Sequence, residues 1–133
     1  GRGKHVNARQ YYLSVQAAIH AAPHVLRSEI RFEEIDGNEC YIRGTLFLLG
    51  DMELHIAEYV ITESGIQRPK YRYHLQSAET KLLISRWDNV AHYPQIASFP
   101  HHRHDNQGGV VSSPAMDIPR LLNAVLAFIP SES

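Results

Sequence analysis

Apolar and polar positions follow a helical spacing at the start of this chain and a strand spacing afterwards. From Tyr12 to Ala22 the apolar residues recur every three or four positions, and Pro23 follows directly. Positions three and four apart share one face of a helix, so this spacing predicts an amphipathic helix over residues 7–22. Its apolar face requires a partner, which the following strands are expected to supply.

Five extended segments follow the predicted helix. Turn-forming pairs such as Asp36-Gly37 and Gly50-Asp51 separate the first three segments. In the fourth segment, tyrosines and a leucine alternate strictly with charged and polar residues, so one side of that strand is expected to be buried and the other wet. The predicted strands, neighbouring and mostly antiparallel, cover residues 26–35, 40–49, 53–62, 70–76 and 82–87.

A second helix is predicted near the end of the chain. Apolar residues from Ile118 to Ile129 share a helical face. Asp117 is placed to cap the start of this helix, Pro119 falls in its first turn, and Pro130 follows its end.

The order of these elements predicts an α+β fold. We expect a single five-stranded, mostly antiparallel sheet with the N-terminal and the C-terminal helix packed on one face. A chain of 133 residues is most simply one domain over residues 1–133. Residues 88–116 lack a usable period, and within them residues 105–113 are expected to form a flexible loop. Residues 1–6 are expected to be flexible or derived from a tag.

The composition argues against several classes of protein. The single cysteine, Cys40, cannot form an internal disulfide, which fits a reducing compartment. No apolar run approaches the ~20 residues of a membrane span, and the first residues carry no apolar segment of the signal-peptide kind. We therefore expect a cytoplasmic protein with no membrane partner.

Charge is unevenly distributed along the chain, although the formal net charge is only -1. Residues 28–66 carry two basic and nine acidic groups, whereas residues 67–104 carry six basic and two acidic groups. Nucleic acid would be attracted by the second block and repelled by the first, which would orient it on the protein. The alternative is that the acidic strands simply have solvated outer faces.

The basic block also holds five of the nine histidines. They are interleaved with arginines and one aspartate in three motifs, YRYHLQ, RWDNVAHYP and FPHHRH. A neutral imidazole takes a proton, an imidazolium gives one and an arginine holds an anionic oxygen, so this mixture suits chemistry on a phosphodiester. The alternative for any one of these histidines is an ordinary surface or core position.

The three motifs together resemble the TumE-type family, small prokaryotic proteins assigned as toxins of type II toxin-antitoxin pairs. The resemblance covers about residues 10–130 in element order, and only the motifs are specific. It implies a cytoplasmic toxin that a partner antitoxin neutralises, often one with a helix-turn-helix DNA-binding domain. The second motif departs from the family pattern, because no proline precedes His92 and Tyr93 stands where a second histidine is common.

Two catalytic roles are predicted within the motifs for the cleavage of RNA. His74 would take the proton of the 2'-hydroxyl, and His102 or His104 would return one to the leaving 5'-oxygen. Arginine would hold the phosphate as its charge grows. The remaining predicted members are Arg72 and Arg86 as phosphate clamps, Asp88 as an orienting carboxylate, and Lys70, Asn89, His92, Tyr93, His101 and Arg103 as substrate contacts.

Aromatic side chains and strand pairing set two further expectations. Tyr71, Tyr73, Trp87 and Tyr93 could stack on unpaired bases, but the first three are at least as well explained as core residues. The fourth and fifth strands can pair in two parities, and we expect the one that puts their polar side chains on a shared face. That face would carry Arg72, His74, Arg86 and Asp88.

The predicted function is that of a toxin acting as a metal-independent ribonuclease, with RNA as substrate and no cofactor. Two alternatives stay open. A divalent metal such as Zn or Mn could be held by His102 and His104, with Asp88, His92 and His101 nearby. Otherwise the protein is a non-catalytic module that binds nucleic acid or protein. A homodimer is compatible with each, and the acidic block or an exposed sheet edge is expected to dock a basic antitoxin segment.

Overall fold

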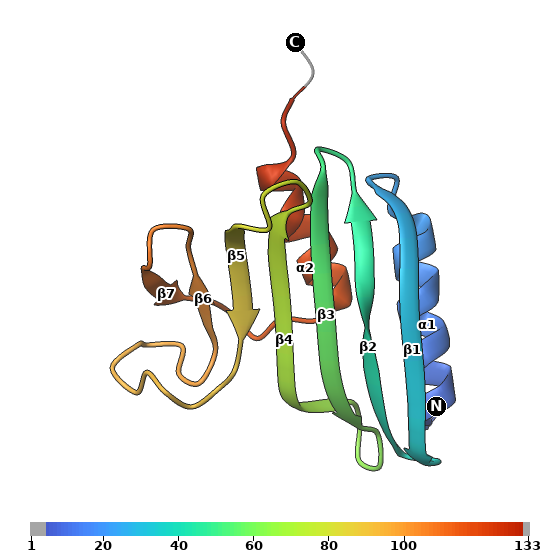
Figure 1. Cartoon of the computed structure of the whole chain (residues 1–133). Helices are drawn as coiled ribbons and strands as arrows, with labels where there is room; N and C mark the ends of the chain where they lie inside the picture. The colour runs from blue at the N-terminus through green and yellow to red at the C-terminus, as the bar shows by residue number, and fades with distance from the viewer. Residues whose placement is uncertain (1–4, 132–133) are drawn as a thin grey trace.

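The computed structural model describes residues 5–131, which form one sheet of seven antiparallel strands backed by two helices (Figure 1). Each strand pairs with the strand that follows it in the chain, so the spatial order is β1 to β7 without a crossover. The strands are β1 (Val25–Asp36), β2 (Glu39–Leu48), β3 (Met52–Ile61), β4 (Gln67–Ser77), β5 (Leu83–Asp88), β6 (His102–His104) and β7 (Val110–Ser112).

The first helix, α1 (Ala8–Ala21), is where the apolar spacing predicts it. The Asn7 side chain accepts a hydrogen bond from the Gln10 backbone N–H, and the Gln10 side chain accepts one from the Asn7 backbone N–H, which together form a capping box. One face of the helix is buried against the sheet, at Ala8, Tyr11, Val15 and Ile19.

The second helix, α2 (Ile118–Ala124), is shorter than predicted. Asp117 caps it, as expected, by accepting a hydrogen bond from the Arg120 backbone. The chain then tightens into a 3-10 turn, η1 (Val125–Phe128), instead of continuing as an α-helix to Ile129. Short 3-10 turns at helix ends are common, and this one still buries the apolar side that the spacing indicates.

The prediction of five strands is wrong in number, because β6 and β7 extend the sheet beyond β5. Each of these strands has three residues, which is too short for any alternation to be visible in the sequence. β7 lies within residues 105–113, the segment expected to be a flexible loop. The expectation for residues 1–6 falls largely on residues 1–4, which lie outside the described part of the chain.

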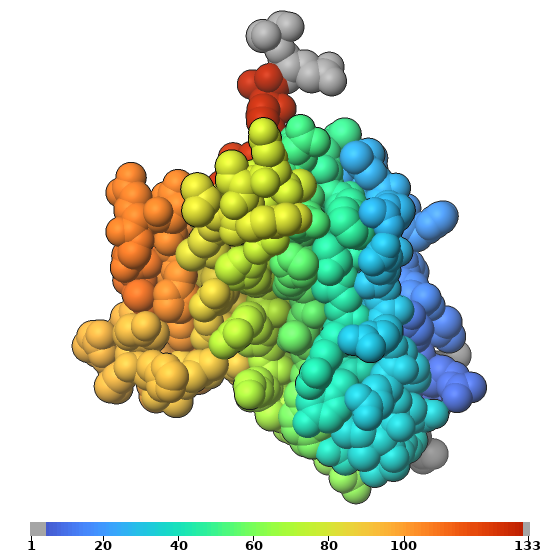
Figure 2. All heavy atoms as spheres, in the orientation of Figure 1, coloured from blue at the N-terminus to red at the C-terminus, as the bar shows by residue number. Residues whose placement is uncertain are grey.

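The two faces of the sheet differ sharply in polarity. Residues such as Leu54, Tyr73 and Trp87 point to the helices and form the core with the apolar faces of α1 and α2. Residues on the other face, which we call the open face, are mostly polar and have no helix over them. In Figures 1 and 2 the helices lie behind the sheet, so the side chains toward the viewer in Figure 2 are those of the open face.

Candidate functional site

Strand pairing gathers all six predicted catalytic residues on the open face. Two rows run across β4, β5 and β6, and neighbours within a row lie directly opposite each other, at a separation of about 5 Å. The predicted shared face is therefore confirmed, although Arg72 lies opposite Asp88 and not opposite Arg86. The first row is Arg72, Asp88 and His102, and the second is His74, Arg86 and His104.

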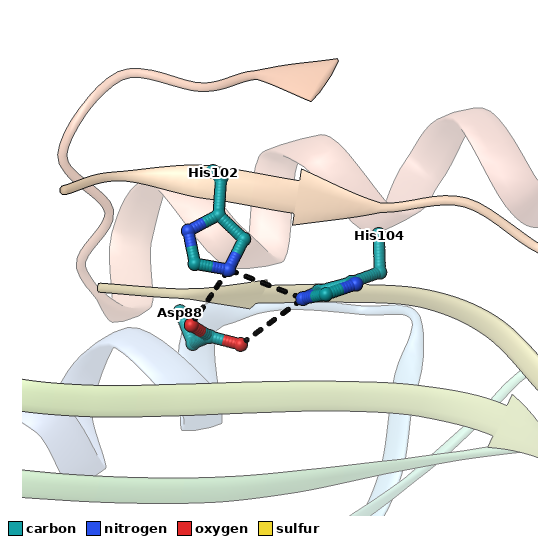
Figure 3. A group of neighbouring side chains, drawn as sticks. All are labelled: Asp88, His102 and His104. Atoms are coloured by element: carbon teal, nitrogen blue, oxygen red, sulfur yellow. Dashed lines mark hydrogen bonds and ion pairs between the residues drawn. The ribbon is translucent and has the colours of Figure 1, made fainter. Parts of the chain in front are cut away.

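Asp88, His102 and His104 meet in one cluster at the junction of β5 and β6 (Figure 3). Nε2 of His102 lies 2.9 Å from Oδ1 of Asp88 and 3.1 Å from Nε2 of His104. Nε2 of His104 lies 3.6 Å from Oδ2 of Asp88. The two histidines are two positions apart on one strand, so both rings fall on the same side and reach the carboxylate.

The cluster is buried on one side and open on the other. The side chains of Asp88 and His102 are only 4% and 2% exposed, whereas that of His104 is 21% exposed. The ring of Tyr93 packs edge-on against both imidazoles. Its centroid lies 4.9 Å from that of the His102 ring and 5.8 Å from that of the His104 ring. Burial lowers the pKa of His104; Asp88 opposes this shift, and the nearby His102 adds to it.

His74 is fixed by Arg86 on the neighbouring strand. Nε of Arg86 donates a hydrogen bond to Nδ1 of His74 over 3.1 Å. Because arginine is always a donor, Nδ1 carries no proton and a neutral His74 carries it on Nε2. Burial lowers the pKa of His74, and the charges of Arg86 and His55 lower it further, so the ring is neutral near pH 7.

A basic, aromatic groove adjoins these rows on the open face, and the sequence did not reveal most of it. The groove has a volume of about 380 Å³. Two tyrosines of β2 and β3 stack in it with their ring centroids 4.9 Å apart, and an arginine lies over one of the rings. The alternation of β2 and β3 could have signalled these residues had the strand register been known. The residues that line the groove include Tyr41, Arg43, Tyr59, Lys70 and Arg72.

Several predicted substrate contacts lie away from this face. Asn89 joins β4 to β5 by accepting from the Tyr71 backbone N–H and donating to the Pro69 carbonyl. His101 forms a hydrogen bond with the Tyr71 hydroxyl on the helix side. Arg103 also points to that side, where it donates to Ser85. His92 is exposed in the loop before β6 and edges onto Tyr93.

Three of the four aromatic residues considered for base stacking are core residues. Tyr71, Tyr73 and Trp87 are at most 4% exposed and point toward the helices. Stacking on RNA is therefore excluded for these three in this fold. Tyr93 differs, because it lies half-buried beside the cluster of Asp88, His102 and His104.

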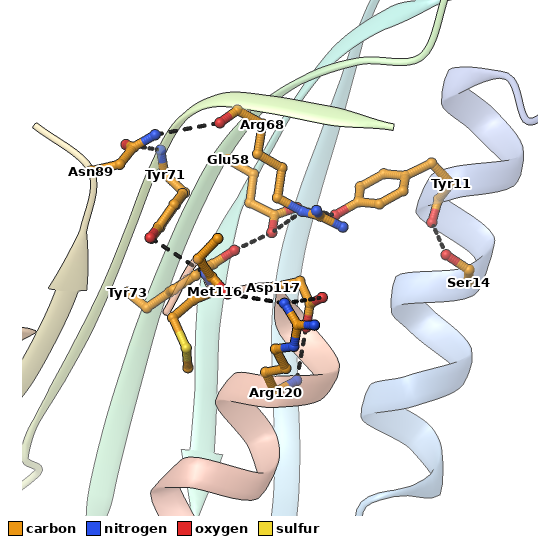
Figure 4. Close-up of polar contacts among 11 residues, drawn as sticks. Tyr11, Ser14, Glu58, Arg68, Tyr71, Tyr73, Asn89, Met116, Asp117 and Arg120 are labelled. Atoms are coloured by element: carbon orange, nitrogen blue, oxygen red, sulfur yellow. Dashed lines mark hydrogen bonds and ion pairs between the residues drawn. The ribbon is translucent and has the colours of Figure 1, made fainter. Parts of the chain in front are cut away.

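A second polar cluster, around Glu58, is buried on the helix side (Figure 4). Glu58 accepts hydrogen bonds from the hydroxyls of Tyr11 (2.5 Å) and Tyr73, and Arg68 lies 3.4 Å from its carboxylate. Burial raises the pKa of Glu58, while both hydroxyls and the guanidinium act against that rise. This cluster joins α1, β3 and β4, and its groups satisfy one another, so its role is structural.

Comparison with known protein families gives a match over most of the chain. The family described as Toxin TumE matches residues 15–133. No curated protein and no solved structure matches the chain. Within residues 5–131, neither helix is long and apolar enough to cross a membrane.

Proposed function

The chain belongs to the Toxin TumE family, and from that premise we propose that it is the toxin of a type II toxin-antitoxin pair and cleaves RNA on the open face of its sheet. One observation carries the proposal. Arginine, histidine and aspartate side chains from β4, β5 and β6 lie in two adjoining rows, next to a basic groove with stacked tyrosines. Phosphate-binding charge, proton-transferring groups and surfaces for unpaired bases therefore share one face.

In the proposed complex, single-stranded RNA follows the groove toward the cluster. Arg43 and Lys70 bind backbone phosphates, and Tyr41 and Tyr59 provide rings on which bases stack. Arg72 belongs both to the groove and to the row of Asp88, so it holds the phosphate that reaches the cluster. His74 donates a hydrogen bond from its Nε2–H to a phosphate oxygen. It does not act as a base.

The proposed reaction is an internal transesterification of RNA. The 2'-oxygen forms a bond to phosphorus, and the bond from phosphorus to the 5'-oxygen breaks. The proton of the 2'-hydroxyl passes to water beside the cluster of Asp88, His102 and His104, and the 5'-oxygen takes a proton from water. Arg72 and Arg86 stabilise the additional negative charge on the phosphoryl oxygens. The products are a 2',3'-cyclic phosphate and a 5'-hydroxyl.

The metal-independent route predicted from the sequence needs two imidazoles that exchange protons with RNA. Nδ1 of His74 is already an acceptor for Arg86, and His102 is almost fully buried. Neither restriction, the occupied Nδ1 of His74 or the burial of His102, applies to His104. This geometry favours the alternative in which the histidines of β6 act together with a bound cation.

Purified protein incubated with single-stranded RNA tests the proposal. We expect cleavage, cyclic-phosphate ends detected by mass spectrometry, and a rate about 100-fold lower for His104→Ala, the usual scale for losing a catalytic group. His20→Ala, which removes an exposed histidine on α1, should keep the wild-type rate. Stoichiometric RNA binding without cleavage would favour a non-catalytic binding module instead.

We also propose that the cognate antitoxin docks at β1, which fits a cytoplasmic pair. β1 is the end strand of the sheet, so one of its edges has no partner strand within residues 5–131. Glu33 and Glu34 are exposed on it, on opposite faces, and Glu34 also forms an exposed ion pair with Arg9 of α1 at 3.2 Å. A basic segment of the antitoxin can add a strand at this edge and pair with these carboxylates.

Charge-reversal variants test whether the antitoxin binds this edge or the interior of the acidic block. Glu33→Lys with Glu34→Lys should weaken antitoxin binding in a calorimetric titration. Glu53→Lys should have less effect, because Glu53 lies on β3, which is paired on both sides by β2 and β4. Equal binding by all three forms would rule out the β1 edge.

A further inference from the structure

We infer that Asp88, His102 and His104 form a binding site for one divalent cation of the zinc class. The inference rests on the proposed function only for its catalytic meaning, because metal binding can be measured without RNA. The ligand atoms would be Nε2 of each imidazole and a carboxylate oxygen. Within residues 5–131, this is the one group of three such side chains whose ligand atoms all lie within 4.8 Å of one another.

The spacing of the ligand atoms fits a small cation. Zinc binds imidazole nitrogen and carboxylate oxygen at about 2.0–2.2 Å in a tetrahedron, whose edges are then about 3.3–3.6 Å long. In the cluster the two Nε2 atoms lie 3.1 Å apart, and they lie 2.9 Å (His102 to Oδ1) and 3.6 Å (His104 to Oδ2) from the two carboxylate oxygens of Asp88. The site takes three ligand atoms, the two nitrogens and one of these oxygens. Small side-chain rotations would bring all three atoms to bonding distance of a common centre.

The hydrogen-bonding pattern of His102 also leaves a place for a cation. Nδ1 of His102 lies 2.9 Å from the carbonyl oxygen of Pro100, which can only accept, so Nδ1 carries a proton. In the neutral ring, Nε2 then presents a lone pair to the carboxylate of Asp88 and to the ring of His104. A proton on Nε2 would form a hydrogen bond directed at only one of these two groups. A cation between the groups would instead accept lone pairs from all three side chains.

The surroundings are those of a metal site with an open position. A second hydrogen bond that fixes the tautomer of a ligating histidine, like that from His102 to Pro100, is the usual support for a metal ligand. Three protein ligands leave a fourth position, which is typical of catalytic sites. That position would be on the side of His104, the exposed member of the cluster.

The strand register places this site next to the phosphate path. Asp88 lies directly opposite Arg72, and His104 lies directly opposite Arg86. A phosphate held by these arginines would therefore be within reach of the open position. A cation there would draw charge from a phosphoryl oxygen, which neither the buried His102 nor the neutral His74 can do.

Metal titration of the chelator-treated full chain tests the site directly. We expect one equivalent of Co²⁺ to give the visible absorption of tetrahedral cobalt, and Zn²⁺ to displace it. His104→Ala and Asp88→Asn should each weaken Zn²⁺ binding at least about 10-fold, the lower end of what losing even a supporting group usually costs. His20→Ala should bind like the wild type, and circular dichroism shows whether each variant is folded.

The results for metal and for RNA are separable. Stoichiometric Zn²⁺ binding that is lost in both folded cluster variants supports the site even when no RNA is cleaved. Absence of binding, or binding unchanged in both variants, overturns it even when RNA is cleaved. Cleavage abolished by chelator and restored by Zn²⁺ or Mn²⁺ supports both proposals, whereas undiminished cleavage in chelator limits the cation to a non-catalytic role and overturns the catalytic meaning given to it here.

Discussion

His74 and Arg86 show how one hydrogen bond can decide what a histidine does. The guanidinium occupies Nδ1 and, with burial, keeps the pKa of the ring low. The side chain that remains available is an N–H donor on the open face. A histidine that is conveniently placed on a strand is thereby turned from a candidate base into a candidate phosphate ligand.

We expect the pKa of His74 to rise in Arg86→Ala, because the variant removes both a positive charge and the donor that requires an unprotonated Nδ1. NMR titration of the ring resonances measures this change. Arg72→Ala is the matched control, since Arg72 contributes the smallest of the charge effects and forms no hydrogen bond to His74 in the described structure. Equal shifts in the two variants would mean that the hydrogen bond has no part in fixing His74.

At the scale of the elements, β1 and β2 approach each other closely at a glycine of β2. Gly44 lies opposite Ile30, and a Cβ at Gly44 would come within 2.8 Å of the Ile30 Cα and even closer to the Glu29 carbonyl oxygen. These are backbone atoms, so they cannot move aside without shifting the strand. β2 also carries Tyr41 and Arg43 of the groove, so this contact helps to position the proposed RNA path.

Gly44→Ala should destabilise the protein by about 1–3 kcal/mol, the usual range for overpacking a closely packed position. Urea unfolding followed by circular dichroism measures the change. Gly37→Ala is the control, because a Cβ at Gly37 has no atom within 4 Å. If both variants unfold at the same urea concentration, the strands have room to separate and the predicted crowding is wrong.

At the scale of the whole molecule, the cluster around Glu58 joins the helix layer to the sheet. Glu58 is 2% exposed. Its carboxylate is contacted by Tyr11 on α1 and by Tyr73 and Arg68 on β4, and the charge of Asp117 before α2 also acts on it. Burial prevails over the hydrogen bonds and the guanidinium, so the pKa of Glu58 is raised. The folded protein therefore binds the Glu58 proton more readily than the unfolded chain does.

This raised pKa predicts a pH dependence of stability. The contribution of Glu58 is fully present below the ordinary glutamate pKa of 4.5 and is lost as the pH rises through the folded-state pKa. Relative to Glu58→Gln, the free energy of unfolding of the wild type should therefore fall as the pH increases across that range. Urea unfolding at several pH values measures it, with Glu33→Gln as the control for the loss of an exposed carboxylate. Parallel curves for the wild type and Glu58→Gln would contradict the raised pKa.

Elements whose residue pattern repeats over many positions could be predicted from the sequence alone. The helix over residues 7–22, the five longer strands and the Asp117 cap could all be predicted, because helical spacing, alternation and capping depend on neighbours in the chain. The two faces of β4 followed from the same alternation. The toxin family was also readable, because its motifs lie in short continuous stretches.

Which of these residues meet depends on how distant strands pair in the folded molecule. β6 reaches Asp88 after an irregular connection over residues 89–101, and no local pattern specifies that pairing. The sequence therefore suggested an HxH metal alternative but could not place Asp88 as its third member. Arg103 and His101 share the same motif yet point to the helix side, since successive residues of a strand face opposite ways. Pairing between distant strands is a property of the packed molecule, so the composition of the site was visible in the sequence and its geometry was not.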